Sequence, residues 1–251
     1  MVEVNIIDVN DKNILKYPPR CFINVNNEGH KQKESWVRDQ FKQGMKIKIL
    51  TTKDTKKMIG YIEYIPGEFA WRAIDAKNQM VIHCIWISPK KHREQGLGSL
   101  LINECVKDAE KQGLSGVAVI ASADSFLAGK EVFLKNNFSI VDQHEPYSLL
   151  LKEFNKAKKP SFCHWKEELA KYQGLHIVYS HQCSWVARFM YEMKNRLDEL
   201  NIRRTELKTA KQAQQAPSIY STFNFISDGK LLADHYISER RFENIIKNEI
   251  S

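Results

Sequence analysis

Long apolar segments are missing from this sequence. No apolar run approaches the roughly 20 residues that a helix needs to cross a bilayer, so we expect no membrane-spanning segment and no membrane partner. The N-terminus, MVEVNIIDVNDKN, also lacks a basic stretch followed by an apolar one, which is the pattern of a secretory signal. The sequence therefore predicts a cytoplasmic protein.

Paired cysteines are missing too. The five cysteines are odd in number and include no C-x-x-C pair, which argues against a disulfide framework and against a zinc site of that spacing. They are Cys21, Cys84, Cys105, Cys163 and Cys183. We expect reduced thiols and no metal. The GxxxxGK[ST] spacing of a Walker A loop is absent as well, and the dinucleotide fingerprint GxGxxG is incomplete.

Positive charge, in contrast, is in surplus. The 251 residues carry 38 Lys and Arg against 30 Asp and Glu, a net charge of +8, and their 43% hydrophobic content can form a core. Phosphorylated ligands, nucleic acid and anionic surfaces are all compatible with this charge. We do not expect nucleic acid as the partner, because no aromatic and basic motif of a known binding module is present.

The N-terminal half alternates between strand and helix patterns. A helical face around Trp36 and Phe41 separates the first two strands, and the third and fourth strands should pair antiparallel. A helix over 97–109 then leads to the apolar run GVAVIA, which predicts a buried strand parallel to the fourth. The expected strands are 2–8, 45–50, 58–65, 80–88, 116–121, 138–143 and 147–153, with a further helix at 127–136. The fold class is α/β with a mixed sheet.

A second domain is expected after the basic segment NKAKKPS, which has no periodicity and ends in proline. We place the domains at 1–157 and 158–251. Within the second, strands are predicted at 175–180 and 202–208, and Asp228-Gly229 is a hairpin turn between two alternating runs. Helices are expected over 185–197, over AKQAQQ and over 237–248.

The segment KKHREQGLGSLLINEC has the composition of an anion site. It joins the end of the 80–88 strand to the start of a helix, where free N–H groups and the helix dipole favour a phosphate. Gly96 and Gly98 let a ligand approach the backbone. The alternative is that the glycines only form a turn and that the basic residues, with Arg93 among them, only face water.

This loop and helix, with the buried strand and the string Lys135-Asn136-Asn137-Phe138 that follow, resemble the GNAT superfamily of acetyl-CoA-dependent N-acyltransferases. The resemblance covers residues 1 to 155. It implies a GNAT fold, acetyl-CoA as co-substrate, and a pyrophosphate held by the backbone of Arg93, Glu94, Gln95, Gly96, Leu97 and Gly98. It also implies that Trp86 and Ile87 receive the pantetheine arm, and the hydroxyl of Ser99 is placed to add a phosphate contact.

The layout of the whole chain, including GYIEYIPGEFAWR and the appended domain, more narrowly resembles the YoaP-like bacterial acetyltransferases. The GNAT resemblance implies that the acceptor is an amine of a small molecule or of a protein. The resemblance does not identify it further.

Acyl transfer needs a base and a proton donor. The tyrosine that often donates this proton in the GNAT pattern is replaced here by Phe133. The candidate bases are Glu63 and His83, each an ionisable residue in an apolar strand, where burial moves a pKa. Alternatively, Glu63 faces water and His83 is an ordinary hydrogen-bonded histidine. Cys84 alternates with Ile82 and Trp86 and is expected to be a packed small hydrophobe.

The loop GEFAWR offers acceptor contacts. Glu68, Trp71 and Arg72 are the candidate substrate residues, with the arginine gripping a substrate carboxylate. The alternative for Trp71 is an ordinary core position.

The second domain looks thioredoxin-like. Cys183 stands at a strand end and helix start, where the dipole would lower a thiol pKa, and Pro217 precedes a later strand. No cysteine stands three positions further on, where Val186 is found. The chain is therefore either an N-acetyltransferase with an accessory domain or a thiol redox or thiol-binding protein whose GNAT domain binds CoA. For Cys183 itself, the alternative to a reactive thiol is a buried structural cysteine.

Overall fold

A computed structural model describes residues 2–19, 21–124 and 126–250. The chain forms two compact units that interleave along the sequence. Unit 1 comprises Met1–Tyr17, Gln40–Ala70 and Asp75–Ser161, and unit 2 comprises Pro18–Asp39, Trp71–Ile74 and Phe162–Ser251. The chain passes from unit 1 to unit 2 for the last time between Ser161 and Phe162.

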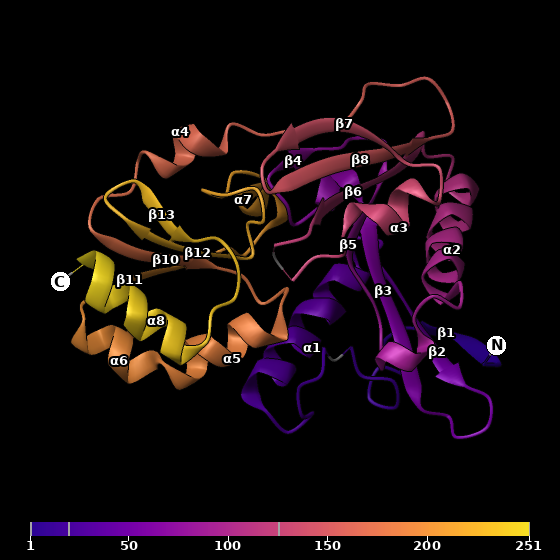
Figure 1. The fold of residues 1–251 in the computed structure, drawn as a ribbon, viewed down its shortest axis with the longest axis horizontal. Helices are drawn as coiled ribbons and strands as arrows, with labels where there is room; N and C mark the ends of the chain where they lie inside the picture. The colour runs from indigo at the N-terminus through magenta and orange to yellow at the C-terminus, as the bar shows by residue number, and fades with distance from the viewer. Residues whose placement is uncertain (1, 20, 125, 251) are drawn as a thin grey trace. The chain divides into compact units, whose positions relative to one another are not determined.

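Unit 1 is built on a seven-stranded sheet of order β1-β2-β3-β5-β6-β8-β7 (Figure 1). Neighbouring strands are antiparallel except β5 and β6, which are parallel. The predicted antiparallel and parallel pairings of this sheet are thus confirmed. The strands are β1 (Val4–Val9), β2 (Lys46–Thr52), β3 (Met58–Pro66), β5 (Met80–Ile87), β6 (Gly116–Ser122), β7 (Ser139–His144) and β8 (Tyr147–Glu153).

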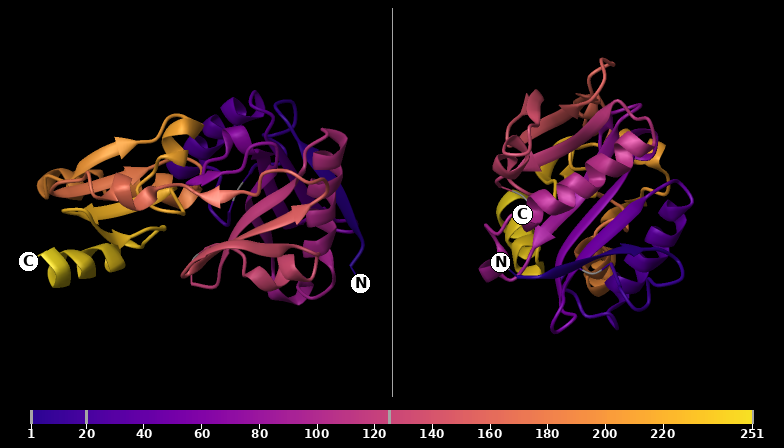
Figure 2. Two further views of the ribbon diagram at one scale, coloured as in Figure 1. Left: turned by 90° about the horizontal axis from the view of Figure 1, so that it is seen from above. Right: turned by 90° about the vertical axis from the view of Figure 1, so that its right-hand side faces the viewer.

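The helix α2 (Leu97–Lys111) lies across one face of this sheet, against β3, β5 and β6 (Figure 1, Figure 2). Its buried side carries Leu101, Cys105 and Ala109 at spacings of four, which is one stripe of a helix. These residues share a core with β-branched residues of the sheet. Shorter elements of the chain are η1 (Gly67–Phe69), β4 (Ile74–Asp75), η2 (Lys90–His92), α3 (Lys130–Leu134) and β9 (Ser161–Phe162).

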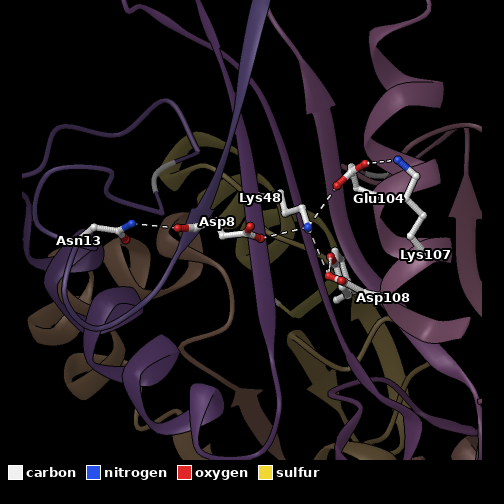
Figure 3. Close-up of polar contacts among 7 residues, drawn as sticks. Asp8, Asn13, Lys48, Glu104, Lys107 and Asp108 are labelled. Atoms are coloured by element: carbon white, nitrogen blue, oxygen red, sulfur yellow. Dashed lines mark hydrogen bonds and ion pairs between the residues drawn. The ribbon is translucent and has the colours of Figure 1, made fainter. Parts of the chain in front are cut away.

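An ionic cluster ties α2 to the edge of the sheet (Figure 3). The ammonium of Lys48 on β2 lies 3.0 Å from Asp8 Oδ1, 3.2 Å from Glu104 Oε2 and 3.4 Å from Asp108 Oδ2. Burial alone would lower the pKa of Lys48, but the three carboxylates together raise it above its ordinary value. The charge of Lys48 therefore persists although its side chain is only 7% exposed.

Unit 2 contains a four-stranded sheet of order β11-β10-β12-β13. β10 (Leu175–Tyr179) pairs parallel with β11 (Arg203–Glu206) and antiparallel with β12 (Phe223–Ser227), which turns at Asp228-Gly229 into β13 (Lys230–Ala233). The predicted hairpin is confirmed.

Several helices surround this second sheet. Three of them, α5 (Ser184–Glu192), α6 (Lys194–Glu199) and α8 (Glu239–Ile245), bury Phe189, Leu197 and Phe242 in one core with β10 and β12. The helix predicted over 185–197 is in fact divided between α5 and α6, and α8 continues into a π-helical segment, Ile246–Ile250. The other helices are α4 (Trp165–Leu169) and α7 (Ala210–Gln214).

The helix α1 (Glu28–Phe41) supplies most of its length to unit 2. It packs closely on α5 through Gly29, where a Cβ atom would lie 2.3 Å from the carbonyl oxygen of Ser184. Any other residue would push the two helices apart. Over residues 2–19, 21–124 and 126–250, no helix is both long and apolar enough to cross a membrane.

Candidate active site

The helix α2 begins without a side-chain cap. Gly96 occupies the capping position in the left-handed region, with φ of 77°, and has no side chain that could accept a hydrogen bond from the first turn. Because the first N–H groups of a helix have no intrahelical acceptor, this end can bind an anion. A Cβ atom at Gly96 would meet nothing within 4 Å, and one at Gly98 would reach Val132 Cγ2 only at 3.5 Å.

The loop before α2 is held by its own side chains. Arg93 Nε donates to the carbonyl of Ile87 at 3.2 Å, and Gln95 Nε2 donates to the carbonyl of Lys91 at 2.8 Å. Gln95 Oε1 in turn accepts from the backbone N–H of Val2 at 3.0 Å. Two side chains of the predicted cradle thus fix the loop's path.

Ser99 has a partner that sequence reasoning missed. Asn136 Nδ2 donates to Ser99 Oγ at 2.9 Å and to the carbonyl of Val132 at 2.7 Å. The serine hydroxyl oxygen therefore accepts from Asn136, and its own proton can still be donated. Asn136 lies in the string that carried part of the resemblance, but nothing in its spacing indicated Ser99.

The strands β5 and β6 part beyond Ile82. Their parallel register runs from Met80 opposite Val117 to Ile82 opposite Val119 and ends there, although β5 continues to Ile87. The predicted pantetheine contacts, Trp86 and Ile87, lie on this unpaired stretch. The backbone of β5 is there available to a bound chain, because β6 no longer takes its hydrogen bonds.

A hollow opens where the two strands part. Residues 82–85 of β5, Val119 and Ile120 of β6, Phe133 of α3 and the connecting residues 126–128 line it. Phe133 is fully buried and packs edge-on against Phe138 with ring centroids 5.6 Å apart. The position where the family pattern often has a tyrosine thus contributes an apolar wall and no proton donor.

The two candidate bases lie side by side. His83 Nδ1 is 3.4 Å from Glu63 Oε1, and their side chains are 0% and 1% exposed. Tyr61, two residues before Glu63 and therefore on the same face of β3, donates from its hydroxyl to Glu63 Oε2 at 2.6 Å. Tyr61 is not among the site residues predicted from the sequence. The ring of Tyr61 also stacks on that of Trp86, with the ring centroids 5.8 Å apart.

A register shift in β5 brings these side chains together. Glu63 pairs with Cys84 but Tyr64 pairs with Ile82, so His83 is the extra residue of a β-bulge. Cys84 and Trp86 pair with Glu63 and Tyr61 and share a face, as predicted, whereas Ile82 pairs with Tyr64 and lies on the opposite face, so that part of the predicted alternation is wrong.

The candidate acceptor residues belong to different units. Glu68 is an exposed residue of unit 1 whose carboxylate accepts from the N–H of Asn78 at 2.8 Å. Trp71 and Arg72 are buried in unit 2. The guanidinium of Arg72 donates to Gln182 Oε1 at 3.2 Å, to Thr222 Oγ1 at 3.1 Å and to the carbonyl of Trp71 at 2.7 Å. It also lies 4.9 Å from the ring centre of Tyr220.

Cys183 precedes α5 at the end of the β10 strand, as predicted. Burial raises the pKa of its thiol, and this outweighs the N–H groups of Val186 and Trp185 and the charges of Lys33 and Arg72, which lower it. The lowered pKa expected from the helix dipole is therefore not found. Pro217 is buried before β12, and its peptide bond is trans, since the cis bonds of the described residues precede Pro89 and Pro146.

Comparison with known proteins is consistent with this arrangement. Residues 13–138, half of the chain, match the acetyltransferase (GNAT) family, and residues 202–244 match the family described as YoaP-like. A curated protein of Bacillus subtilis (strain 168), named "Uncharacterized N-acetyltransferase YoaP", is 25% identical over 254 residues. The match covers 98% of this chain and 97% of that protein.

Two of the solved structures that match this chain each cover 61% of it. The PaiA N-acetyltransferase of Thermoplasma acidophilum in complex with coenzyme A is 15% identical, with 61% of this chain and 99% of that chain covered and a TM-score of 0.41. The IAA acetyltransferase of Bacillus cereus ATCC 14579 is 14% identical, with 61% and 100% covered and a TM-score of 0.41.

Proposed function

Because the chain belongs to the acetyltransferase (GNAT) family of acyl-CoA-dependent N-acetyltransferases, we propose that it transfers the acetyl group of acetyl-CoA to an amine of a small molecule or protein. The observation that carries the proposal is the open start of α2, where Gly96 leaves the first turn uncapped beside the parted strands β5 and β6. One feature suits a pyrophosphate and the other an extended chain that ends in a thioester.

The donor would lie along this junction. The backbone from Arg93 to Gly98 would hold the pyrophosphate at the helix N-terminus, where the dipole adds about half a positive charge. Ser99 would donate its hydroxyl to a phosphate oxygen. The pantetheine arm would follow the unpaired edge of β5 past Trp86 and Ile87 and bring the thioester to the hollow. The open space at Gly96 supports this fit.

The reaction needs a base more than it needs an acid. The acceptor nitrogen attacks the thioester carbonyl, loses a proton, and the C–S bond breaks with its electron pair on sulfur. Glu63 and His83 are the proposed basic residues, and their contact at 3.4 Å supports that role. With Phe133 in the acid position, the CoA sulfur would leave as a thiolate.

The acceptor residues are proposed on weaker geometry. Glu68 is exposed and could pair with an ammonium group of the acceptor. Trp71 and Arg72 are buried among side chains of unit 2, so a direct contact with a substrate carboxylate would require Arg72 to exchange one of its present partners.

For the C-terminal part of unit 2 we propose a thioredoxin-like fold that serves recognition and not redox chemistry. A parallel pair joined through α5 and α6, a following antiparallel hairpin, and the positions of Cys183 and Pro217 support the fold. The raised pKa of Cys183 weighs against a reactive thiolate. The five free cysteines favour the predicted cytoplasmic location.

The test is acetyl transfer itself. The protein is incubated with acetyl-CoA and separate pools of primary amines, amino acids and small thiols, and free CoA is measured together with the mass of each acceptor. We expect CoA release with an amine pool and an acetylated amine among the products. Release with thiols alone, or binding of acetyl-CoA without any release, would contradict the proposal and favour a CoA-binding or thiol-directed protein.

A further inference from the structure

Three side chains of unit 1 form a continuous buried chain of polar contacts. The Tyr61 hydroxyl donates to Glu63 Oε2 at 2.6 Å, and Glu63 Oε1 lies 3.4 Å from His83 Nδ1. Tyr61 is 3% exposed, and the other two side chains are essentially unexposed. Each carboxylate oxygen of Glu63 therefore faces one neighbouring side chain: Oε2 faces Tyr61, and Oε1 faces His83.

Only one end of the chain of contacts reaches the parted strands. The described residues that line the hollow include His83 but neither Glu63 nor Tyr61. The bulge at His83 causes this, because it places both His83 and Cys84 opposite Glu63. Bulges of this kind commonly redirect a side chain beside an active site.

We propose that Tyr61, Glu63 and His83 form a relay of side chains in which His83 is the catalytic base that takes the proton and Glu63 and Tyr61 are positioning residues. The inference rests on the proposed function. That function names both Glu63 and His83 as basic residues, and the inference assigns the role of base to His83 alone. Glu63 keeps the proton of neutral His83 on Nδ1, which leaves the Nε2 lone pair as the proton acceptor. Tyr61 fixes the carboxylate that does so.

The proton balance of the step is simple. As the C–N bond forms, the acceptor nitrogen gives one proton to Nε2 of His83, and the C–S bond then breaks with its electron pair on sulfur. The imidazolium is stabilised by the carboxylate of Glu63 and passes its proton to the CoA thiolate, directly or through water. The distance of 3.4 Å is longer than a formed hydrogen bond, and such contacts often shorten in the substrate complex.

The decisive measurement is the tautomer of His83 in the full-length protein. Long-range proton–nitrogen NMR on the histidine-labelled chain reports which ring nitrogen carries the proton, and His83→Gln assigns the signal by its loss. We expect the neutral ring to be protonated on Nδ1. A neutral ring protonated on Nε2 would overturn the proposal, and no acceptor substrate is needed for this result.

Two variants test the positioning residues through the titration of the same ring. Glu63→Gln removes a negative charge beside the imidazolium, so the His83 titration should move to lower pH. Tyr61→Phe removes the hydrogen bond that the tyrosine hydroxyl donates to Glu63. The carboxylate then keeps more negative charge to stabilise the imidazolium, so the His83 titration should move to higher pH. Unchanged titration in Glu63→Gln, or shifts of the same sign in both variants, would contradict the relay.

Tyr64→Phe is the matched control. Tyr64 is on the same strand, is also buried, and donates a hydrogen bond of the same 2.6 Å length to Asp108 on the face of α2. Its loss should cost comparable stability without moving the His83 titration. A shift in Tyr64→Phe equal to that in Tyr61→Phe would show that general destabilisation, and not the relay, moves the ring.

Turnover separates the two possible bases. With an amine that is acetylated, His83→Gln should lower kcat by about 10²- to 10⁴-fold and remove the acid limb of the pH profile, with KM for acetyl-CoA unchanged. If Glu63 were the base, Glu63→Gln would remove that limb and His83→Gln would keep it. Absence of acetyl-CoA binding in calorimetry would instead contradict the proposed function and leave the tautomer result standing.

Discussion

The side-chain amide of Asn136 donates a 2.9 Å hydrogen bond to the hydroxyl oxygen of Ser99, and so ties the turn after α3 to the first turn of α2. Asn136 is itself anchored to the carbonyl of Val132 at 2.7 Å. The hydroxyl is thereby oriented before any ligand arrives. A hydroxyl that is oriented beforehand costs less ordering on binding, so under the proposed function this pair would contribute to the affinity for acetyl-CoA.

Ser99→Ala should therefore weaken acetyl-CoA binding by about 2- to 10-fold, because one hydrogen bond contributes about 0.5–1.5 kcal/mol. Asn136→Ala should weaken it less, since the hydroxyl remains but is no longer held. The double variant should resemble Ser99→Ala alone, because Asn136 acts through Ser99. Calorimetry on the four proteins measures this cycle, and strictly additive losses would show that the two residues act independently.

The Lys48 cluster predicts a difference between two lysines that contact the same glutamate. Lys48 is 7% exposed and faces three carboxylates, whereas Lys107 is 68% exposed and lies 2.7 Å from Glu104. Lys48→Met should destabilise the fold by about 1–3 kcal/mol because it leaves partly buried carboxylates without their cation. Lys107→Met should cost less than about 1 kcal/mol, as for other surface pairs. Urea unfolding checks both, and equal losses would contradict the cluster's buried character.

The Cys183 thiol should react slowly with iodoacetamide. Its pKa lies above the ordinary 9.0, so the thiolate is a small fraction near neutral pH. The alkylation rate should keep rising beyond pH 9, and the same residue should react faster in the urea-unfolded chain. Mass spectrometry of the peptide that contains Cys183 follows the reaction. Fast labelling of the folded protein at pH 7 would contradict the raised pKa of this thiol and revive the redox interpretation.

The order of strands and helices could be predicted from the pattern of apolar residues, because α2 buries one regular stripe and the central strands β3 and β6 are continuous buried runs. The parallel pairing of β5 and β6 followed from the continuous apolar run GVAVIA and the crossover helix before it. The open start of α2 was also visible, since two glycines and a helix pattern are local features of the sequence.

Other features depend on contacts between distant residues. The bulge at His83 is set by the pairing with β3, so simple alternation wrongly placed Ile82 on the face of Cys84. The tie from Asn136 to Ser99 joins residues 37 positions apart. Likewise, the dipole argument for Cys183 considered its own helix and could not include the burial that raises the thiol pKa.

The central claim is that the uncapped start of α2 binds the donor, and calorimetric titration with acetyl-CoA tests it most directly. Gly96 and Gly113 are matched, because both have positive φ, flank the two ends of α2, and have open space around a Cβ. We predict that Gly96→Glu and Arg93→Glu abolish or strongly weaken binding while Gly113→Glu binds as the wild type does. Equal binding by all four proteins, or no binding by the wild type at micromolar concentration, would contradict the claim.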